Sequence, residues 1–227
     1  MEPTRRSDAI QAFTNAIWGD ELARRDSAMT ISLAVRDQRG SAVELDAEAL
    51  AKAFPAASGR LVVLLHVLGQ TERCFSPRDA VPGLTEALAL SSLTPVPVLY
   101  NSGRSVADTG EELDVLLEQL IAHWPVRVTE IALVGYSMGG LVARAATASG
   151  HANARRWVDA VRHVVTVAAP HFGSPIETAV GVAERARLEA PQTSRVGAFL
   201  GLRCAGVGEL RSGPGLRGAG AGGWLAR

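Results

Sequence analysis

Ser137 is the residue whose surroundings most clearly indicate chemistry. It stands in VGYSMGG, with Gly135 and Gly139 two residues to either side. The apolar run before it predicts a buried strand, and the residues after it predict a helix that begins at once. A serine on such a strand-to-helix turn is presented as a nucleophile. Because its hydroxyl reacts weakly near neutral pH, it needs a base within hydrogen-bond reach and a third group that orients the base.

Two backbone N–H groups are expected to stabilise the oxyanion that attack by Ser137 would form. Met138 begins the expected helix, and the first N–H groups of a helix have no partner within it. The second N–H is expected from Leu68, in the loop that follows the apolar run from Leu61. His66, at the end of that run, is expected to brace the loop. We expect no metal ligands and no cofactor at this site.

Two interpretations without this chemistry remain open for the serine stretch. It could be an ordinary Ser/Gly turn, or a glycine-rich loop that presents the N–H groups of a helix end to a phosphate. The phosphate interpretation is disfavoured because neither G-x-x-x-x-G-K-[ST] nor G-x-G-x-x-G surrounds Ser137.

The elements that must position Ser137 follow from the apolar pattern. Residues 29–37 and 41–46 alternate apolar and polar side chains around QRG, which predicts a half-buried hairpin. Four later apolar runs, LVVLLHVLG, TPVPVLYNS, EIALVGYS and RHVVTVAAP, are each separated by helix-length segments. This alternation predicts an α/β fold with a mostly parallel sheet flanked by helices. The helix before Ser137 is expected to start with a Thr109–Glu112 capping box and to end before Pro125.

Over roughly residues 20–210 the sequence resembles the α/β-hydrolase serine esterases and lipases, in the branch of GPI inositol-deacylase-like and triacylglycerol-lipase-like proteins. The resemblance rests on HVLGQTE, LYNSGR with ADTGEEL, VGYSMGGLVAR and AAPHFGSP. It implies an α/β-hydrolase fold, an acyl-enzyme on Ser137 and an ester substrate. Val67 stands where the family usually has glycine, and Tyr136 where it usually has histidine.

The resemblance also implies an acid and then a histidine on loops after later strands. We expect these two partners, and the last strands of the sheet, to be missing from this chain. His171 is expected to shape the pocket, with a base role as a minor alternative; His151 and His163 are expected at the surface and at a strand edge. The acids after Ser137 are expected to be solvated charges: Asp159, Glu177, Glu184 and Glu209.

Composition and length indicate the domain organisation, the partners and the localisation to expect. With 227 residues and 47% hydrophobic content, the chain is long enough for one core. We expect a hydrolase domain over residues 1–210 that is incomplete at its C-terminus, and a non-native-looking Gly/Ala/Arg tail over 211–227, which suggests a frameshift. The formal net charge of zero disfavours nucleic-acid binding. No apolar run is long enough to span a membrane, and two cysteines form no disulfide framework, so a cytoplasmic protein is expected.

The sequence therefore predicts a serine hydrolase for small-molecule or lipid carboxylic esters, impaired because the triad acid and histidine are missing. The alternative is a non-catalytic remnant or interaction module that keeps the pocket. The strand RHVVTVAAP is expected to be an exposed sheet edge through which the chain self-associates.

Overall fold

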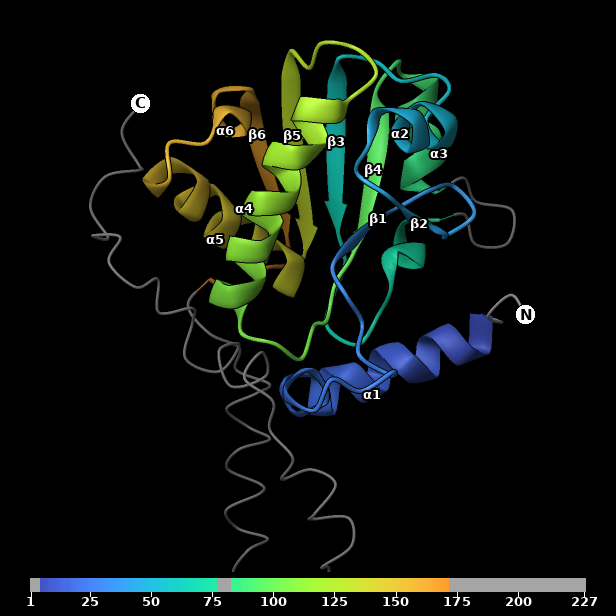
Figure 1. The fold of residues 1–227 in the computed structure, drawn as a ribbon, viewed down its shortest axis with the longest axis vertical. Coiled ribbons are helices and arrows are strands. Elements are labelled where there is room, and N and C mark those ends of the chain that lie inside the picture. The colour runs from blue at the N-terminus through green and yellow to red at the C-terminus, as the bar shows by residue number, and fades with distance from the viewer. Residues whose placement is uncertain (1–4, 77–82, 172–227) are drawn as a thin grey trace, which may run out of the picture.

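The computed structural model describes residues 5–76 and 83–171, and the expected tail and domain boundary near residue 210 lie outside them. In the described part, a six-stranded sheet runs in the order β2-β1-β4-β3-β5-β6 (Figure 1). The strands are β1 (Ala34–Arg36), β2 (Ala42–Val43), β3 (Arg60–Leu65), β4 (Thr94–Leu99), β5 (Glu130–Tyr136) and β6 (Val161–Val167). The helices are α1 (Arg5–Arg24), α2 (Ala47–Ala53), the 3-10 helix η1 (Glu72–Phe75), α3 (Leu84–Leu90), α4 (Val106–His123), α5 (Met138–Ala152) and α6 (Arg156–Asp159).

The order and direction of the strands confirm the predicted architecture. β4, β3, β5 and β6 are parallel neighbours, while β1 is antiparallel to both β2 and β4. The hairpin expected around QRG is the β1–β2 pair. Because β3, β4, β5 and β6 point the same way, the loops that follow them meet at one end of the sheet, where α1 also lies (Figure 1). This mostly parallel sheet flanked by helices fits the α/β-hydrolase fold that the resemblance implies.

Successive residues of the central strands face two different apolar clusters. Leu61 and Val63 of β3 belong to the larger cluster, which includes the buried faces of α4 and α5. Val62 and Leu64 belong to a smaller cluster on the opposite face, with Phe75 of η1. A parallel strand buried on both faces reads as a continuous apolar run, as LVVLL does.

Two prolines inside β4 are accommodated by the short length of its neighbour. β1 pairs only with Val98 and Leu99 of β4, whereas Pro95 and Pro97 lie in the part of β4 that pairs only with β3 among the described strands. A proline cannot donate a ladder hydrogen bond, so it is tolerated where one side of a strand lacks a partner.

The predicted capping box at Thr109 and Glu112 is wrong. Helix α4 begins one turn earlier, at Val106, because the Ser105 hydroxyl caps it by accepting from the N–H of Asp108 at 3.1 Å. The predicted end is confirmed, since Trp124 is the C-cap and precedes Pro125. Among the described residues, no helix is both long and apolar enough to cross a bilayer.

Candidate active site

Ser137 lies between the last residue of β5 and the first residue of α5. Its backbone angles are φ 52° and ψ −116°, a conformation that residues with a side chain rarely adopt. Such a conformation costs on the order of 1–3 kcal/mol and persists only when its surroundings hold it. One such constraint is the Ser137 N–H, which donates to the Val167 carbonyl at the end of β6 at 2.7 Å. The strained turn that the sequence predicts at Ser137 is therefore present.

The two glycines that flank Ser137 are required by close backbone contacts. A Cβ added to Gly135 would lie 2.3 Å from the carbonyl carbon of Gly139. A Cβ added to Gly139 would lie 2.2 Å from the carbonyl oxygen of Leu65, the last residue of β3. Both distances are far shorter than any real contact. The G-x-S-x-G spacing thus lets α5 begin directly against the end of β3.

The N–H of Met138 is placed at the start of α5. Met138 is the first residue of this 15-residue helix, and its side chain is fully buried in the larger core cluster. The N–H of the first residue of a helix has no acceptor within the helix and lies at the positive end of its dipole. The Met138 N–H is therefore suited to stabilise an anion that forms next to Ser137.

The loop that carries Leu68 begins beside the serine turn, because Leu65 of β3 is paired with Gly135 of β5. Leu68 packs against the larger core cluster. Gly69 follows it with φ +70°, in a tight turn closed by a Gln70 N–H to Val67 carbonyl bond of 3.2 Å. The Gly69 N–H also donates to Ser102 Oγ at 3.0 Å, which ties the loop to the residues after β4.

His66 and Tyr100 hold the start of this loop. The Tyr100 N–H donates to His66 Nε2 at 3.2 Å, so Nδ1 carries the ring proton and donates to the Val67 carbonyl at 2.9 Å. The Tyr100 hydroxyl donates to the His66 carbonyl at 2.5 Å, and the two rings stack with centroids 4.1 Å apart. Full burial lowers the pKa of His66 to about 4. His66 is thus a neutral brace, as the sequence predicts, and not a proton acceptor for Ser137.

His171 is held by partners other than Ser137. Arg144 Nη1 lies 2.9 Å from His171 Nδ1, and because arginine can only donate, Nδ1 is the acceptor. Nε2 then carries the proton and donates to Thr166 Oγ1 at 3.1 Å. Burial and the Arg144 charge both lower the pKa of His171. In this arrangement both ring nitrogens are engaged, which leaves the minor base role of His171 without support.

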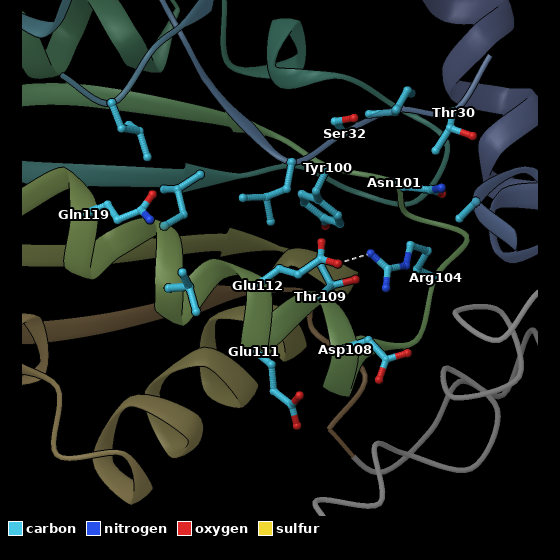
Figure 2. A pocket seen from close by; sticks show the side chains of 16 residues that line it. Thr30, Ser32, Tyr100, Asn101, Arg104, Asp108, Thr109, Glu111, Glu112 and Gln119 are labelled. Carbon is cyan, nitrogen blue, oxygen red and sulfur yellow. Dashed lines mark hydrogen bonds and ion pairs between the residues drawn. The ribbon is translucent and has the colours of Figure 1, made fainter. Parts of the chain in front are cut away.

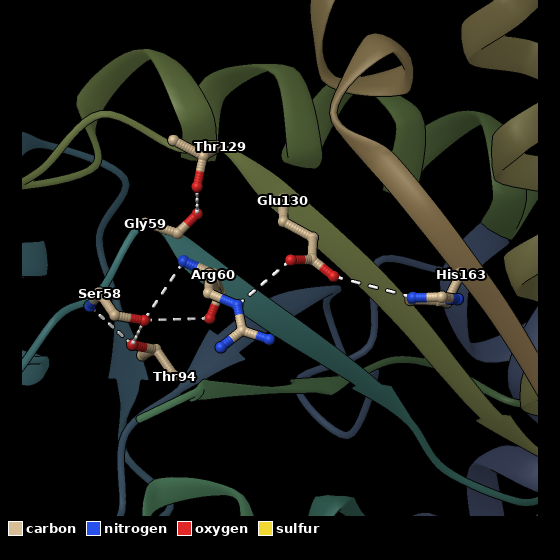
Figure 3. Close-up of polar contacts among 7 residues, drawn as sticks. All are labelled: Ser58, Gly59, Arg60, Thr94, Thr129, Glu130 and His163. Carbon is tan, nitrogen blue, oxygen red and sulfur yellow. Dashed lines mark hydrogen bonds and ion pairs between the residues drawn. The ribbon is translucent and has the colours of Figure 1, made fainter. Parts of the chain in front are cut away.

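His163 and His151 lie far from Ser137. His163 faces Ala132 on β5, five residues before Ser137, which is about 16 Å along the strand. There it pairs with Glu130 at 3.8 Å, and Glu130 also pairs with Arg60 at 3.2 Å, in a row across the opposite end of the sheet (Figure 3). His151 lies near the end of α5, about 21 Å from Ser137.

The fifth histidine, His123, ends α4, where its ring bonds to the Gln119 carbonyl. The chain contains five histidines, and all lie in the described residues.

The carboxylates considered after Ser137 do not supply a triad acid. Asp159 is exposed at the end of α6, as expected, and Glu177, Glu184 and Glu209 lie outside the described residues.

Asp114 on α4 is a buried carboxylate that the sequence analysis missed. It accepts from Trp157 Nε1 at 2.8 Å, Ser149 Oγ at 3.1 Å, Asn153 Nδ2 at 3.2 Å and Arg155 Nε at 3.3 Å. These partners lie at the far end of α5 and beyond it, so Asp114 joins α4, α5 and α6.

The larger of two described cavities lies near the end of β4, with a volume of about 700 Å³. Figure 2 shows its polar lining, in which Arg104 and Glu112 form an ion pair beside Thr109. Ser137 does not line this cavity, although Tyr100 contributes to both the cavity and the loop brace. The described residues include no group of three His, Cys, Asp or Glu side chains arranged to hold a metal ion.

Comparisons with known proteins found similarity to one protein family and to solved structures. A family model described as a PGAP1-like alpha/beta domain matches residues 100–186, which include Ser137. No curated protein matches the chain. Among solved structures, the mature form of lipase BlEst2 from Bacillus licheniformis is similar at 18% identity with a TM-score of 0.47. The match covers 67% of this chain and 54% of that lipase, so the chain spans about half of the lipase's length.

Proposed function

We propose that this chain, an α/β-hydrolase-fold protein that contains a PGAP1-like segment, is a serine hydrolase of carboxylic esters with Ser137 as its nucleophile. The observation that carries the proposal is the backbone of Ser137, held at φ 52° between β5 and α5. Positive φ alone also occurs at Ser92, with φ 57°, in the turn after α3, but the ψ of −116° at Ser137 lies outside the left-handed region that ordinary turns use. The strain raises the hydroxyl above the end of the sheet.

In the proposed reaction, Ser137 Oγ attacks the ester carbonyl carbon. The serine proton passes to a base, the carbonyl oxygen becomes an oxyanion, and the N–H groups of Leu68 and Met138 stabilise it. When the oxyanion collapses, the base returns the proton to the leaving oxygen, the alcohol departs and an acyl-enzyme remains. Water then releases the acid and regenerates the serine, with no metal or organic cofactor. An alcohol in place of water would give an acyltransferase from the same residues.

The rate of ester hydrolysis that we propose depends on a base that can accept the Ser137 proton. Each of the five histidines has a position or ring partners that separate it from Ser137 in the structure. Without a histidine base, a serine hydroxyl stays protonated near neutral pH and reacts slowly. We therefore expect turnover well below the roughly 10 s⁻¹ of a median enzyme.

Hydrolysis of p-nitrophenyl butyrate by this chain tests the proposal. Wild type should be slow, Ser137→Ala should lose the protein-dependent rate, and Ser91→Ala should match wild type because Ser91 is exposed at the end of α3. An identical rate for Ser137→Ala and wild type would refute the nucleophile. A rate typical of esterases that depends on Ser137 would keep the nucleophile but show that a base acts on it.

The second candidate function is a non-catalytic binding module with the same fold. It is favoured by one observation: both ring nitrogens of His171, which follows β6, are bonded to residues other than Ser137. This candidate predicts ester binding without release of acid. For either function we propose a cytoplasmic protein without a nucleic-acid partner, on the basis of its composition and zero net charge.

A further inference from the structure

The direction of the Leu68 N–H, the second oxyanion donor of the proposed reaction, is fixed by the peptide bond that it shares with the Val67 carbonyl. That carbonyl accepts from His66 Nδ1 at 2.9 Å and from the Gln70 N–H at 3.2 Å. In a planar trans peptide the N–H points opposite to the C=O. The Leu68 N–H therefore points away from the His66 ring and out of the turn that Gln70 closes. In the part of the chain that the structure describes, this N–H makes no hydrogen bond.

A correct direction does not by itself place the donor, because the whole turn must also lie at a fixed distance from Ser137. His66 joins one end of the turn to β3. The other end is joined to the segment after β4, since the Gly69 N–H donates to Ser102 Oγ at 3.0 Å. Among the described side chains, Ser102 is the one that bonds to the backbone of residues 68–70 from another part of the chain.

Ser102 is itself held in place by helix α1. It is only 2% exposed. The neighbouring Asn101 donates through Nδ2 to the Gly19 carbonyl of α1 at 2.9 Å, and its Oδ1 accepts from the Gly103 N–H at 3.0 Å. A Cβ added to Gly103 would lie 1.9 Å from the Asn15 carbonyl oxygen, so this segment lies directly against α1. The Ser102 hydroxyl is thus a fixed acceptor and not a mobile one.

Helix α1 also contacts the turn that carries Leu68. A Cβ built on Gly69 would lie 3.6 Å from the Cβ of Ala16, which is an ordinary contact distance. Ala16 is 5% exposed, and α1 lies across the end of the sheet where the loops after β3 and β4 meet (Figure 1). The turn, the segment after β4 and α1 therefore pack as one unit, in which the Ser102 hydroxyl is the polar link.

We propose that Ser102 is a positioning residue for the oxyanion donor Leu68. The inference rests on the proposed function, because the position of this N–H matters only if Ser137 attacks an ester. Ser102 holds the Gly69 N–H and thereby the turn, so the Leu68 N–H meets the oxyanion without reorganisation of the loop. Ser102 acts through the backbone and does not touch the reacting atoms. A misplacement of about 1 Å in such a group costs up to roughly 100-fold in rate.

Hydrolysis of p-nitrophenyl butyrate by Ser102→Ala tests this role. Loss of the acceptor should lower the Ser137-dependent kcat by about 10- to 100-fold and leave KM within about twofold, because the oxyanion is absent from the bound ester. Ser58→Ala is the matched control. Ser58 Oγ also accepts from a backbone N–H, that of Arg60 at 3.2 Å, but at the opposite end of the sheet (Figure 3). This variant should keep the wild-type kcat and KM.

A second variant and a second measurement keep the test decisive if Ser102→Ala fails to fold. Ser102→Cys has a side chain of similar size that accepts hydrogen bonds weakly, so its kcat should also fall while its KM is kept. The Gly69 N–H should be protected from hydrogen exchange in wild type and should exchange at least about tenfold faster in the Ser102 variants, since a bonded N–H exchanges only after local opening.

An unchanged Ser137-dependent kcat in the Ser102 variants would overturn the positioning role and leave the proposed function intact. Equal losses in Ser102→Ala and Ser58→Ala, a loss confined to KM, or an unprotected Gly69 N–H in wild type would overturn it as well. A wild-type rate that does not depend on Ser137 would refute the proposed function itself, and the role of Ser102 would fall with it.

Discussion

Acidification should destabilise the protein through His66, whose neutral ring braces the loop that carries Leu68. Burial lowers the pKa of His66 to about 4 in the folded protein, against about 6.5 in an unfolded chain. Between these two pH values the unfolded chain binds a proton that the folded chain does not. The free energy of unfolding is therefore unaffected above about pH 6.5 and falls as the pH decreases toward 4. A difference of about 2.5 pKa units corresponds to roughly 3 kcal/mol.

Urea denaturation at pH steps from 7.5 to 4 measures this loss in wild type and in His66→Gln. The glutamine amide oxygen can still accept from the Tyr100 N–H but does not titrate. The wild-type free energy of unfolding should fall by about 3 kcal/mol relative to that of His66→Gln across this range. Val98→Ala removes buried apolar groups without a titratable one, so its curve should run parallel to wild type.

Parallel curves for wild type and His66→Gln would refute the interpretation of His66 as a buried neutral brace.

Three further changes test the packing of the fold. Gly139→Ala should cost about 1–3 kcal/mol in chemical denaturation, because its Cβ would collide with the end of β3; wild-type stability would contradict the close contact. Asp114→Asn should cost about 2 kcal/mol by weakening the bonds that join three helices, and an unchanged melt would make that network dispensable. Wild type should self-associate in size-exclusion chromatography with light scattering, and the double variant Val165→Lys, Val167→Lys should self-associate less, since these two β6 residues are 45% and 48% exposed. A monomeric wild type would refute the edge-strand prediction.

The sequence predicted the sheet well because its strands carry strong local signals. The apolar run of β3 is continuous, as a parallel strand buried on both faces requires. The run of β5 is also largely apolar, although its residues alternate between buried and half-buried. The serine turn could also be predicted from the sequence, since only glycine fits at positions 135 and 139. The start of α4 was mispredicted because Ser105 and Thr109 both offer cap chemistry, and the choice depends on how the chain leaves β4.

The parts that could not be predicted depend on contacts between distant segments. The burial of Asp114 follows from Trp157 and Arg155, about 40 residues later, and an acidic residue inside a helix gives no local sign of it. His171 was placed in the right loop, but its bond to Arg144 depends on the packing of α5 against the end of β6.

Labelling with a fluorophosphonate, followed by peptide mass spectrometry, tests the nucleophilic role of Ser137 most directly. The probe reacts covalently with an activated serine and does not depend on the identity of the ester substrate. We predict one adduct, on Ser137, that forms slowly, disappears in Ser137→Ala and persists in the exposed control Ser91→Ala. Folded wild-type protein that acquires no adduct, or acquires one on another serine, would contradict the role assigned to the strained turn between β5 and α5.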